Sequence, residues 1–384
     1  MKKTLSIMVM LLLIFLYVSL PINVVSADTL EETISKELQG LDLEALENFY
    51  NGLDKGESVD FYTLIYGFIN GTYSLNYNDL SGVIKDMLLY NVKSIIPSLI
   101  SVVIIAIVFS LTENLKGQKL NSSVKNTIRI SCVLAVLIVV ITKVRGLFQS
   151  VKIVIENMAI FSEIMSPIMI SLIVASGGNV SASIYSPSVV FLSNGFINIV
   201  LMVLLPLNVL IMVFGVVSSF SDKIKLQKFS DFFASTFKWV LGISVTICGV
   251  FMTVQGLNAS IIDGVSLKAA KYAISNSVPM IGGFLRDGFD IVTCGTIIIK
   301  NVIGIAGVFA LFYLILAPVM HLIVYSLCFK LVSAIIEPFS NDKILGVCTI
   351  CSKAITYLII CILVVGLMLF LNVLILMISS SAFI

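Results

Sequence analysis

The sequence predicts an all-α, polytopic membrane protein with about six spans, two re-entrant or broken hairpins and a small amphipathic helical segment outside the cytoplasm at its N-terminus. Of 384 residues, 58% are hydrophobic and 12% charged, whereas soluble domains have about 45–50% and 25%. The mean hydropathy is +1.08. Several apolar stretches approach or exceed the roughly 18 residues of a spanning helix. These stretches are continuous, which favours helices over a barrel of short alternating strands.

Residues 1–27 have the pattern of a secretory signal peptide. Lys2 and Lys3 precede the apolar run Leu5–Leu20, and Val25-Ser26-Ala27 fits a small-residue cleavage site. The alternative is an uncleaved anchor helix, against which Pro21 and the cleavage-like triplet argue. In either case the following segment is expected outside the cytoplasm.

Residues 28–93 form an acidic segment, with twelve acidic residues against four lysines. Leu30, Ile34, Leu38 and Leu41 repeat at helical spacing, which predicts short amphipathic helices. Its aromatic residues could face a partner or the bilayer interface, or the segment could be a cap packed on the membrane domain.

Residues 94–384 form the predicted transmembrane domain. The expected spans are Ile95–Leu111, Ile128–Val144, Val189–Val217, Trp239–Gly256, Val302–Phe329 and Ala354–Ser379. Two further apolar segments, Ile160–Ser176 and Tyr272–Ile299, contain prolines and charged residues. Three lysine-containing loops lie in the cytoplasm, as the positive-inside rule requires, if the first segment is a re-entrant hairpin or crosses an even number of times and the second is re-entrant.

The two halves of this domain resemble each other, which suggests parallel repeats at 128–220 and 240–332. Pro167 precedes Pro206 by 39 residues, and Pro279 precedes Pro318 by the same 39. Side-chain identity elsewhere between the halves is near chance.

The broken segments are where we expect a conduit or hinge, because irregular backbone at membrane depth must be buried in protein or face a water-filled cavity. Ionisable groups there are costly and often functional. The alternative for the charges near residue 287 is an interfacial turn with ordinary ion pairs. The candidate residues are Glu163, Pro167, Pro206, Asn276, Pro279, Gly282, Gly283, Arg286, Asp287, Asp290, Asn301 and Pro318.

No motif for catalysis, a cofactor, a metal or nucleic acid is evident in the sequence. His321 is the single histidine and lacks ligands at a convincing spacing; helix packing is its simpler role. Cys348 and Cys351 form an isolated CxxC, which we interpret as incidental. Without a phosphate-binding loop, any energised process needs a separate motor, so we expect no enzyme.

The stretch KYAISNSVPMIGGFLRDGFD (Lys271–Asp290) and the downstream Lys300, Asn301, Gly304 and Gly307 resemble the stage III sporulation protein AE family of endospore-forming bacteria. The exported N-terminus, the acidic segment and the hydrophobic remainder also fit that family in length and order.

The resemblance implies an integral subunit of the secretion-like channel complex that links mother cell and forespore and is required for forespore development and late gene expression. Such a subunit lies in the mother-cell membrane around the forespore, with its N-terminal segment in the intermembrane space. Its partners would be other stage III sporulation membrane proteins, their ATPase, a forespore-membrane protein and the lipid bilayer. A stand-alone secondary transporter and a non-conducting scaffold stay open as alternatives.

Overall fold

The computed structural model describes residues 46–49, 100, 103–104, 122–220, 226–277, 282–337 and 342–379. The expected signal peptide, most of the acidic segment and most of the first expected span, Ile95–Leu111, lie outside the described residues. The account below therefore concerns the membrane domain from residue 122 onward.

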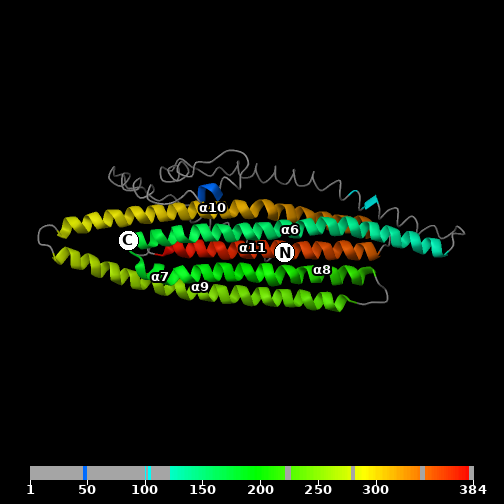
Figure 1. Ribbon diagram of the computed structural model, residues 1–384, viewed down its shortest axis with the longest axis horizontal. Helices are drawn as coiled ribbons and strands as arrows, with labels where there is room; N and C mark the ends of the chain where they lie inside the picture. Colours follow the sequence, from blue (N-terminus) through cyan, green and yellow to red (C-terminus); the bar gives the residue numbers. More distant parts are fainter. Residues whose placement is uncertain are drawn as a thin grey trace.

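Long helices lie side by side along one common axis (Figure 1), with helix α11 in the middle of the view. Its neighbours bury much of α11, and this contact forms the core. In the described residues the chain is helical, in agreement with the predicted all-α class. The elements are α6 (Ser122–Ala175), α7 (Asn179–Ile199), the π-helical turn η1 (Val200–Leu204), α8 (Leu205–Phe220), α9 (Gln227–Ser277), α10 (Gly282–Ile336) and α11 (Asp342–Ile378).

Among the described residues, five helical stretches are long and apolar enough to cross a membrane. They are Leu137–Ala175, Asn179–Ser219, Gln227–Met252, Ile291–Ile336 and Ile344–Ile378. Several exceed the roughly 20 residues that a bilayer requires. Helix α10, with 55 residues, is about 80 Å long at 1.5 Å per residue. Parts of these helices therefore extend beyond a single bilayer thickness.

The structure corrects the prediction that the chain turns back inside Ile160–Ser176. Helix α6 continues from Ser122 through Ala175 as one 54-residue helix. Met165 and Phe161 lie against Gly307 of α10, in the middle of the bundle. Residues 160–176, which were expected to form a hairpin, are thus the part of α6 that packs beside the other apolar helices. The expected span Ile128–Val144 is an earlier part of the same helix, whose N-terminal end projects past its neighbours (Figure 1).

The reversal occurs instead just after α6, at Gly177. Gly177 has a φ of 90°, which glycine adopts without steric cost. Its N–H donates to the Val174 carbonyl at 2.9 Å, and the Gly178 N–H donates to the Ile173 carbonyl at 2.8 Å. This pair of bonds is a Schellman motif, which caps the last carbonyls of a helix.

The second expected hairpin, Tyr272–Ile299, comprises the end of α9 and the start of α10. Helix α9 ends at Ser277 and α10 begins at Gly282, so the chain reverses between them. Residues 278–281, including Pro279, lie outside the described residues. Whether this reversal is re-entrant in a bilayer stays a prediction, as do the two sequence repeats.

Prolines inside the helices are accommodated locally. Pro167 lies within α6, Pro187 within α7 and Pro318 within α10. Pro206 follows η1, where the Leu205 N–H donates to the Val200 carbonyl five residues earlier. Proline lacks an N–H and its ring clashes with the carbonyl four residues before it. A single π turn relieves that clash while keeping the rod continuous.

The direction of the helices brings the two basic connections to one end of the bundle. Helix α8 ends and α9 begins at the same end at which α10 ends and α11 begins (Figure 1). The positive-inside orientation requires this arrangement. Which end faces the cytoplasm stays a prediction.

Candidate functional site

The predicted conduit residues do not converge on one cavity. Glu163 and Pro167 are exposed on α6, and Pro206 is exposed on α8. Asn301 and Pro318 are half-buried on α10.

The other predicted residues gather where α9 and α10 meet. Asn276 lies in the last turn of α9, and the rest lie in the first turns of α10. These others are Gly282, Gly283, Arg286, Asp287 and Asp290. The side chains in both turns lie outside the described part of the chain, so the ion pairs considered for them stay untested.

Around Glu163 and Pro167, α6 presents polar side chains along one face, which we call the α6 polar stripe. The members recur every three or four residues, the spacing of one helix face, except between Glu156 and Glu163, where the exposed Ile160 interrupts them; Pro167 is the apolar member. All are exposed except Glu156, which is half-buried. The members are Arg145, Gln149, Lys152, Glu156, Glu163, Pro167 and Ser171.

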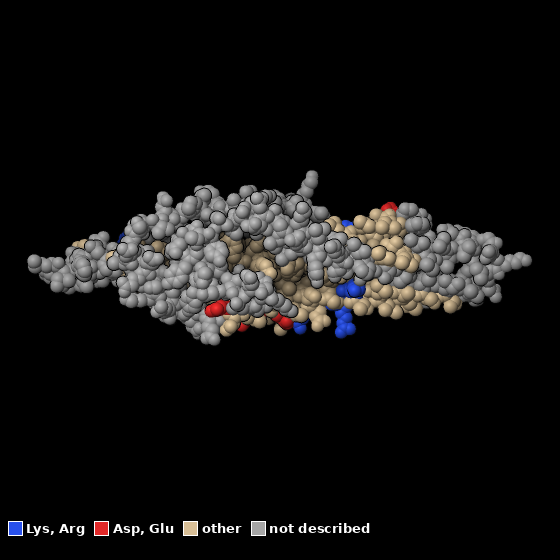
Figure 2. All heavy atoms as spheres, turned by 90° about the horizontal axis from the view of Figure 1, so that it is seen from above, with Lys and Arg blue, Asp and Glu red and all other residues tan. Residues whose placement is uncertain are grey.

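The opposite face of α6 is apolar and buried. Val151, Ile155, Met158, Phe161 and Met165 are each at most 1% exposed. Helix α6 therefore presents the stripe outward, on a side that it shares with the exposed apolar residues Ile160 and Val174. In Figure 2, the visible acidic and basic side chains are few, and several of them lie along the lower edge of the view.

Glu163 is the most unusual member of the stripe. Its neighbours Phe161 and Met165 pack against Gly307, deep among the apolar spans. Lys152 and Glu156 pair at 3.6 Å, but Glu163 has no ion pair within the described residues. A carboxylate at membrane depth is costly unless it meets water or a cation.

A second set of polar groups joins α11 to its neighbours inside the bundle. The Asn372 amide donates to the Ser193 hydroxyl on α7 at 2.8 Å, and both side chains are buried. The Asn208 amide on α8 donates to the Ala354 carbonyl at 3.0 Å. The Asn208 carbonyl oxygen has no hydrogen-bond partner in the described structure.

The longest polar side chain in this set is Lys300 on α10, which is fully buried. Its Nζ donates to the backbone carbonyl of Ser379, just past the end of α11. Gly304 and Gly307 follow at spacings of four and three, which places them on the same face of α10 as Lys300. Gly304 lies against Met377 of α11 and Gly307 against Met165 of α6. This motif therefore joins three helices.

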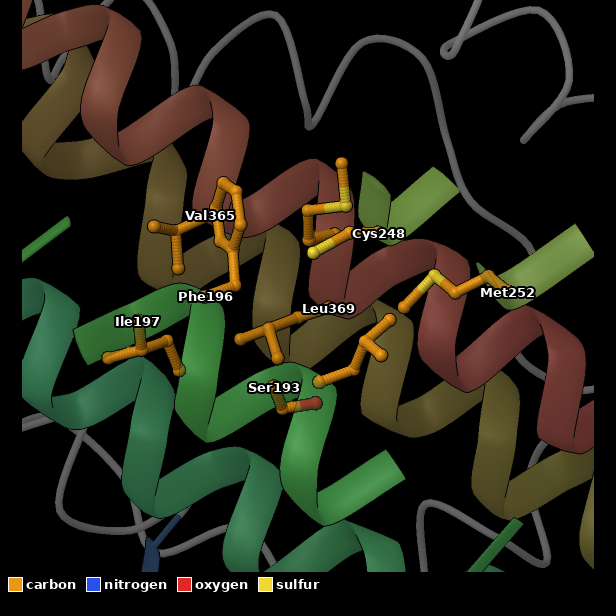
Figure 3. Close-up of a pocket in the computed structure, with 9 residues that line it drawn as sticks. Ser193, Phe196, Ile197, Cys248, Met252, Val365 and Leu369 are labelled. Carbon is orange, nitrogen blue, oxygen red and sulfur yellow. The ribbon is translucent and has the colours of Figure 1, made fainter. Parts of the chain in front are cut away.

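A small pocket lies between α7, α9 and α11 (Figure 3). Its lining is apolar except for Ser193, whose hydroxyl already accepts the Asn372 bond. It suits helix packing better than catalysis. The lining residues are Leu192, Ser193, Phe196, Ile197, Cys248, Met252, Val365, Met368 and Leu369.

The described part of the chain contains no group of three or more His, Cys, Asp or Glu that could hold a metal. His321 packs edge-on against Tyr325, with ring centroids 4.9 Å apart. Cys348 and Cys351 are buried and free. The described side chains thus provide an outward charged stripe and an inward packing network.

Sequence reasoning missed most of this packing network. Lys300 was noted as part of a motif but not as a site residue, and Ser193, Asn372 and Ser379 were not considered. One signal was present: a charged side chain inside an otherwise apolar run, with glycines four and seven residues further on. Such spacing predicts a buried, closely packed helix face.

Comparison with known proteins gives a consistent picture. The family model described as "Stage III sporulation protein AE" matches residues 59–380. A curated relative of the same name from Bacillus subtilis (strain 168) is 24% identical over 360 residues, covering 90% of this chain and 88% of the relative. No solved structure matches.

Proposed function

Because the chain belongs to the stage III sporulation protein AE family, we propose that it is the integral membrane subunit of the complex linking mother cell and forespore. In this proposal it lies in the mother-cell membrane, and the α6 polar stripe borders a water-filled path. The family membership and the five apolar helices support a multi-pass sporulation protein. The conduit and the partners are the proposed part.

The exposure of Glu163 carries the conduit proposal. A lipid-facing helix presents apolar side chains outward, as α9 does with Ile243 and Ile247, which are 47% and 62% exposed. Helix α6 presents Glu163 outward as well, between the exposed Ile160 and Val174 (each 46%) and beside core residues that are almost fully buried. Since an unpaired carboxylate favours water over hydrocarbon, this face of α6 is suited to an aqueous boundary.

The polarity of the stripe also indicates what could pass. Arg145 and Lys152 lie toward the N-terminal end of the stripe, and Glu156 and Glu163 follow. Both charge signs are therefore present along the path. A mixed lining of this kind favours hydrated small solutes over one class of ion.

The test is hydration of the stripe in the membrane. Glu163→Cys and Ser171→Cys are introduced one at a time into the full chain, and modification by a charged, water-soluble thiol reagent is measured in opened membranes isolated from sporulating cells. The matched control is Val213→Cys on α8, an exposed apolar position (47%). The unsubstituted chain, with its seven cysteines, gives the background.

We expect the stripe cysteines to react at least tenfold faster than the α8 control, because the reagent and the reactive thiolate both require water. Equal, slow modification at all three positions would remove the conduit and favour the scaffold. A loss of spore formation in Glu163→Gln, with normal protein levels, would link the hydrated face to function. Normal sporulation in that variant would count against a role for the charge.

A further inference from the structure

The outward face of α7 carries two amides that do not fit a lipid-facing surface. Asn198 is exposed and Asn194 half-exposed, one helical turn apart. Neither side chain has a hydrogen bond among the described residues. Both lie within Asn179–Ser219, a helical stretch of 41 residues that is long and apolar enough to cross a membrane, and Asn198 is near its middle.

The residues around these amides form a shape suited to another helix. Phe191 and Met202 flank them and are 76% and 75% exposed, which leaves both almost free of contacts within the chain. Gly195 lies between the amides, and a Cβ there would have nothing within 4 Å. We call Phe191, Asn194, Gly195 and Asn198 of α7, together with Met202 of the following turn η1, the α7 outer face.

We propose that the α7 outer face is an intramembrane contact between two copies of this chain, with Asn198 of each copy hydrogen-bonded to Asn198 of the other. An unsatisfied amide in hydrocarbon is costly, and helix contacts in membranes are formed by small residues and by side-chain hydrogen bonds. The glycine allows close approach, and the two large apolar side chains supply contact area.

A second copy is the occupant that the geometry favours. Identical chains insert into the membrane with the same orientation, so each residue meets its counterpart at the same depth. A carboxamide is both a donor and an acceptor, and two of them related by a two-fold axis satisfy each other. Such self-complementarity is the property of an isologous contact.

The contact is independent of the conduit proposal, because it uses a different face of a different helix. Helix α7 nevertheless packs against α6. A copy seated on the α7 outer face would thus contact a helix that itself packs against α6.

The experiment is cross-linking of the full chain in lipid vesicles. Met202→Cys and Phe191→Cys are oxidised separately, and Trp239→Cys on α9, which is 69% exposed, is the matched control for an outward-facing position. The unsubstituted chain gives the background from its seven cysteines. We expect a covalent dimer from the two α7 variants at least fivefold above the control and the background.

Asn198→Leu and Asn198→Gln then test the hydrogen bond, with the dimer fraction measured by energy transfer between labelled copies. We expect Asn198→Leu to weaken dimerisation several-fold, roughly threefold for each hydrogen bond lost. Asn198→Gln should retain much of it because its side chain keeps the amide. A dimer unaffected by Asn198→Leu, or cross-linking at Trp239→Cys equal to that at Met202→Cys, would overturn the proposal. Cross-linking of the α7 positions only to a different protein in sporulating cells would overturn it as well.

Discussion

The ammonium group of Lys300 on α10 donates a hydrogen bond to the backbone carbonyl of Ser379 at the end of α11. The last carbonyls of a helix have no partner within the helix, and they lie at the negative end of its dipole. A buried cation from a neighbouring helix donates a hydrogen bond to such a carbonyl and interacts favourably with the negative end of the dipole. It also fixes where α11 ends relative to α10.

Replacing Lys300 by Met should loosen the end of α11. The side chain stays long and apolar, but the Ser379 carbonyl loses a charged donor, and hydrogen bonds to charged groups contribute about 1.5–3 kcal/mol. We expect amide hydrogen exchange in the last turn of α11 to accelerate by roughly ten- to a hundredfold. Lys300→Arg should restore part of the protection. Unchanged exchange in Lys300→Met would show that the carbonyl does not depend on this bond.

Gly304 lies in close contact with Met377, so a larger side chain at position 304 should clash with the Met377 side chain. A Cβ at Gly304 would overlap the Met377 side chain, with its sulfur only 2.6 Å away. Gly304→Val should therefore lower the free energy of unfolding in detergent by about 1–3 kcal/mol, the usual effect of overpacking. Adding Met377→Ala should recover part of that loss. Gly242→Val on α9, where nothing lies within 4 Å, is the matched control and should change stability little.

Much of the fold can be predicted from the sequence, because a bilayer requires long apolar runs in the spans and favours basic loops on the cytoplasmic side. The four later predicted spans, beginning with Val189–Val217, each overlap one of the long apolar helical stretches. Which part of α6 packs against the other spans could not be predicted in the same way. Pro167 and Glu163 made the segment beside them look broken, whereas packing against Gly307 keeps it helical. Hydropathy measures composition along the chain, and it contains no information about which part of a long helix meets its neighbours.

The candidate site, too, could be predicted from the sequence only in part. The sequence alone identified Glu163 as a costly charge at membrane depth, and the structure adds that it belongs to an outward polar stripe. The partners of Lys300 and Asn372 are 79 and 179 residues away in the chain. Such contacts depend on tertiary arrangement, which no local spacing reveals.

Two polar contacts of α11 should differ in strength because one is buried and the other is not. Asn372 and Ser193 are each 4% exposed. A double-mutant cycle with Asn372→Leu and Ser193→Ala should give a coupling of about 0.6–1.7 kcal/mol, the range for such bonds within membranes. Coupling near zero would indicate that the two groups contribute independently.

The ion pair of Lys353 with Asp231 is the surface counterpart. Its atoms are 3.6 Å apart, and the side chains are 40% and 57% exposed. Exposed pairs of this kind contribute about 0–1 kcal/mol and are screened by salt. A cycle with Lys353→Met and Asp231→Asn should therefore give less than about 0.5 kcal/mol. A larger coupling that persists in high salt would show that lipid shields this pair from water.

The orientation of the bundle can be tested at two exposed positions near opposite ends. Asn179 begins α7, just after the Gly177 reversal, and Lys228 lies in the first turn of α9. If the basic connections face the cytoplasm, Asn179→Cys should react with an impermeant thiol reagent added outside intact, non-sporulating cells that produce the chain, in which the outer face of the membrane meets the medium. Lys228→Cys should react only after the membrane is opened. Asn179 is chosen as the probe in place of the nearby Ser181 because Ser181 is fully buried. The reverse pattern would invert the bundle and place the α6–α7 reversal in the cytoplasm, contrary to the distribution of lysines.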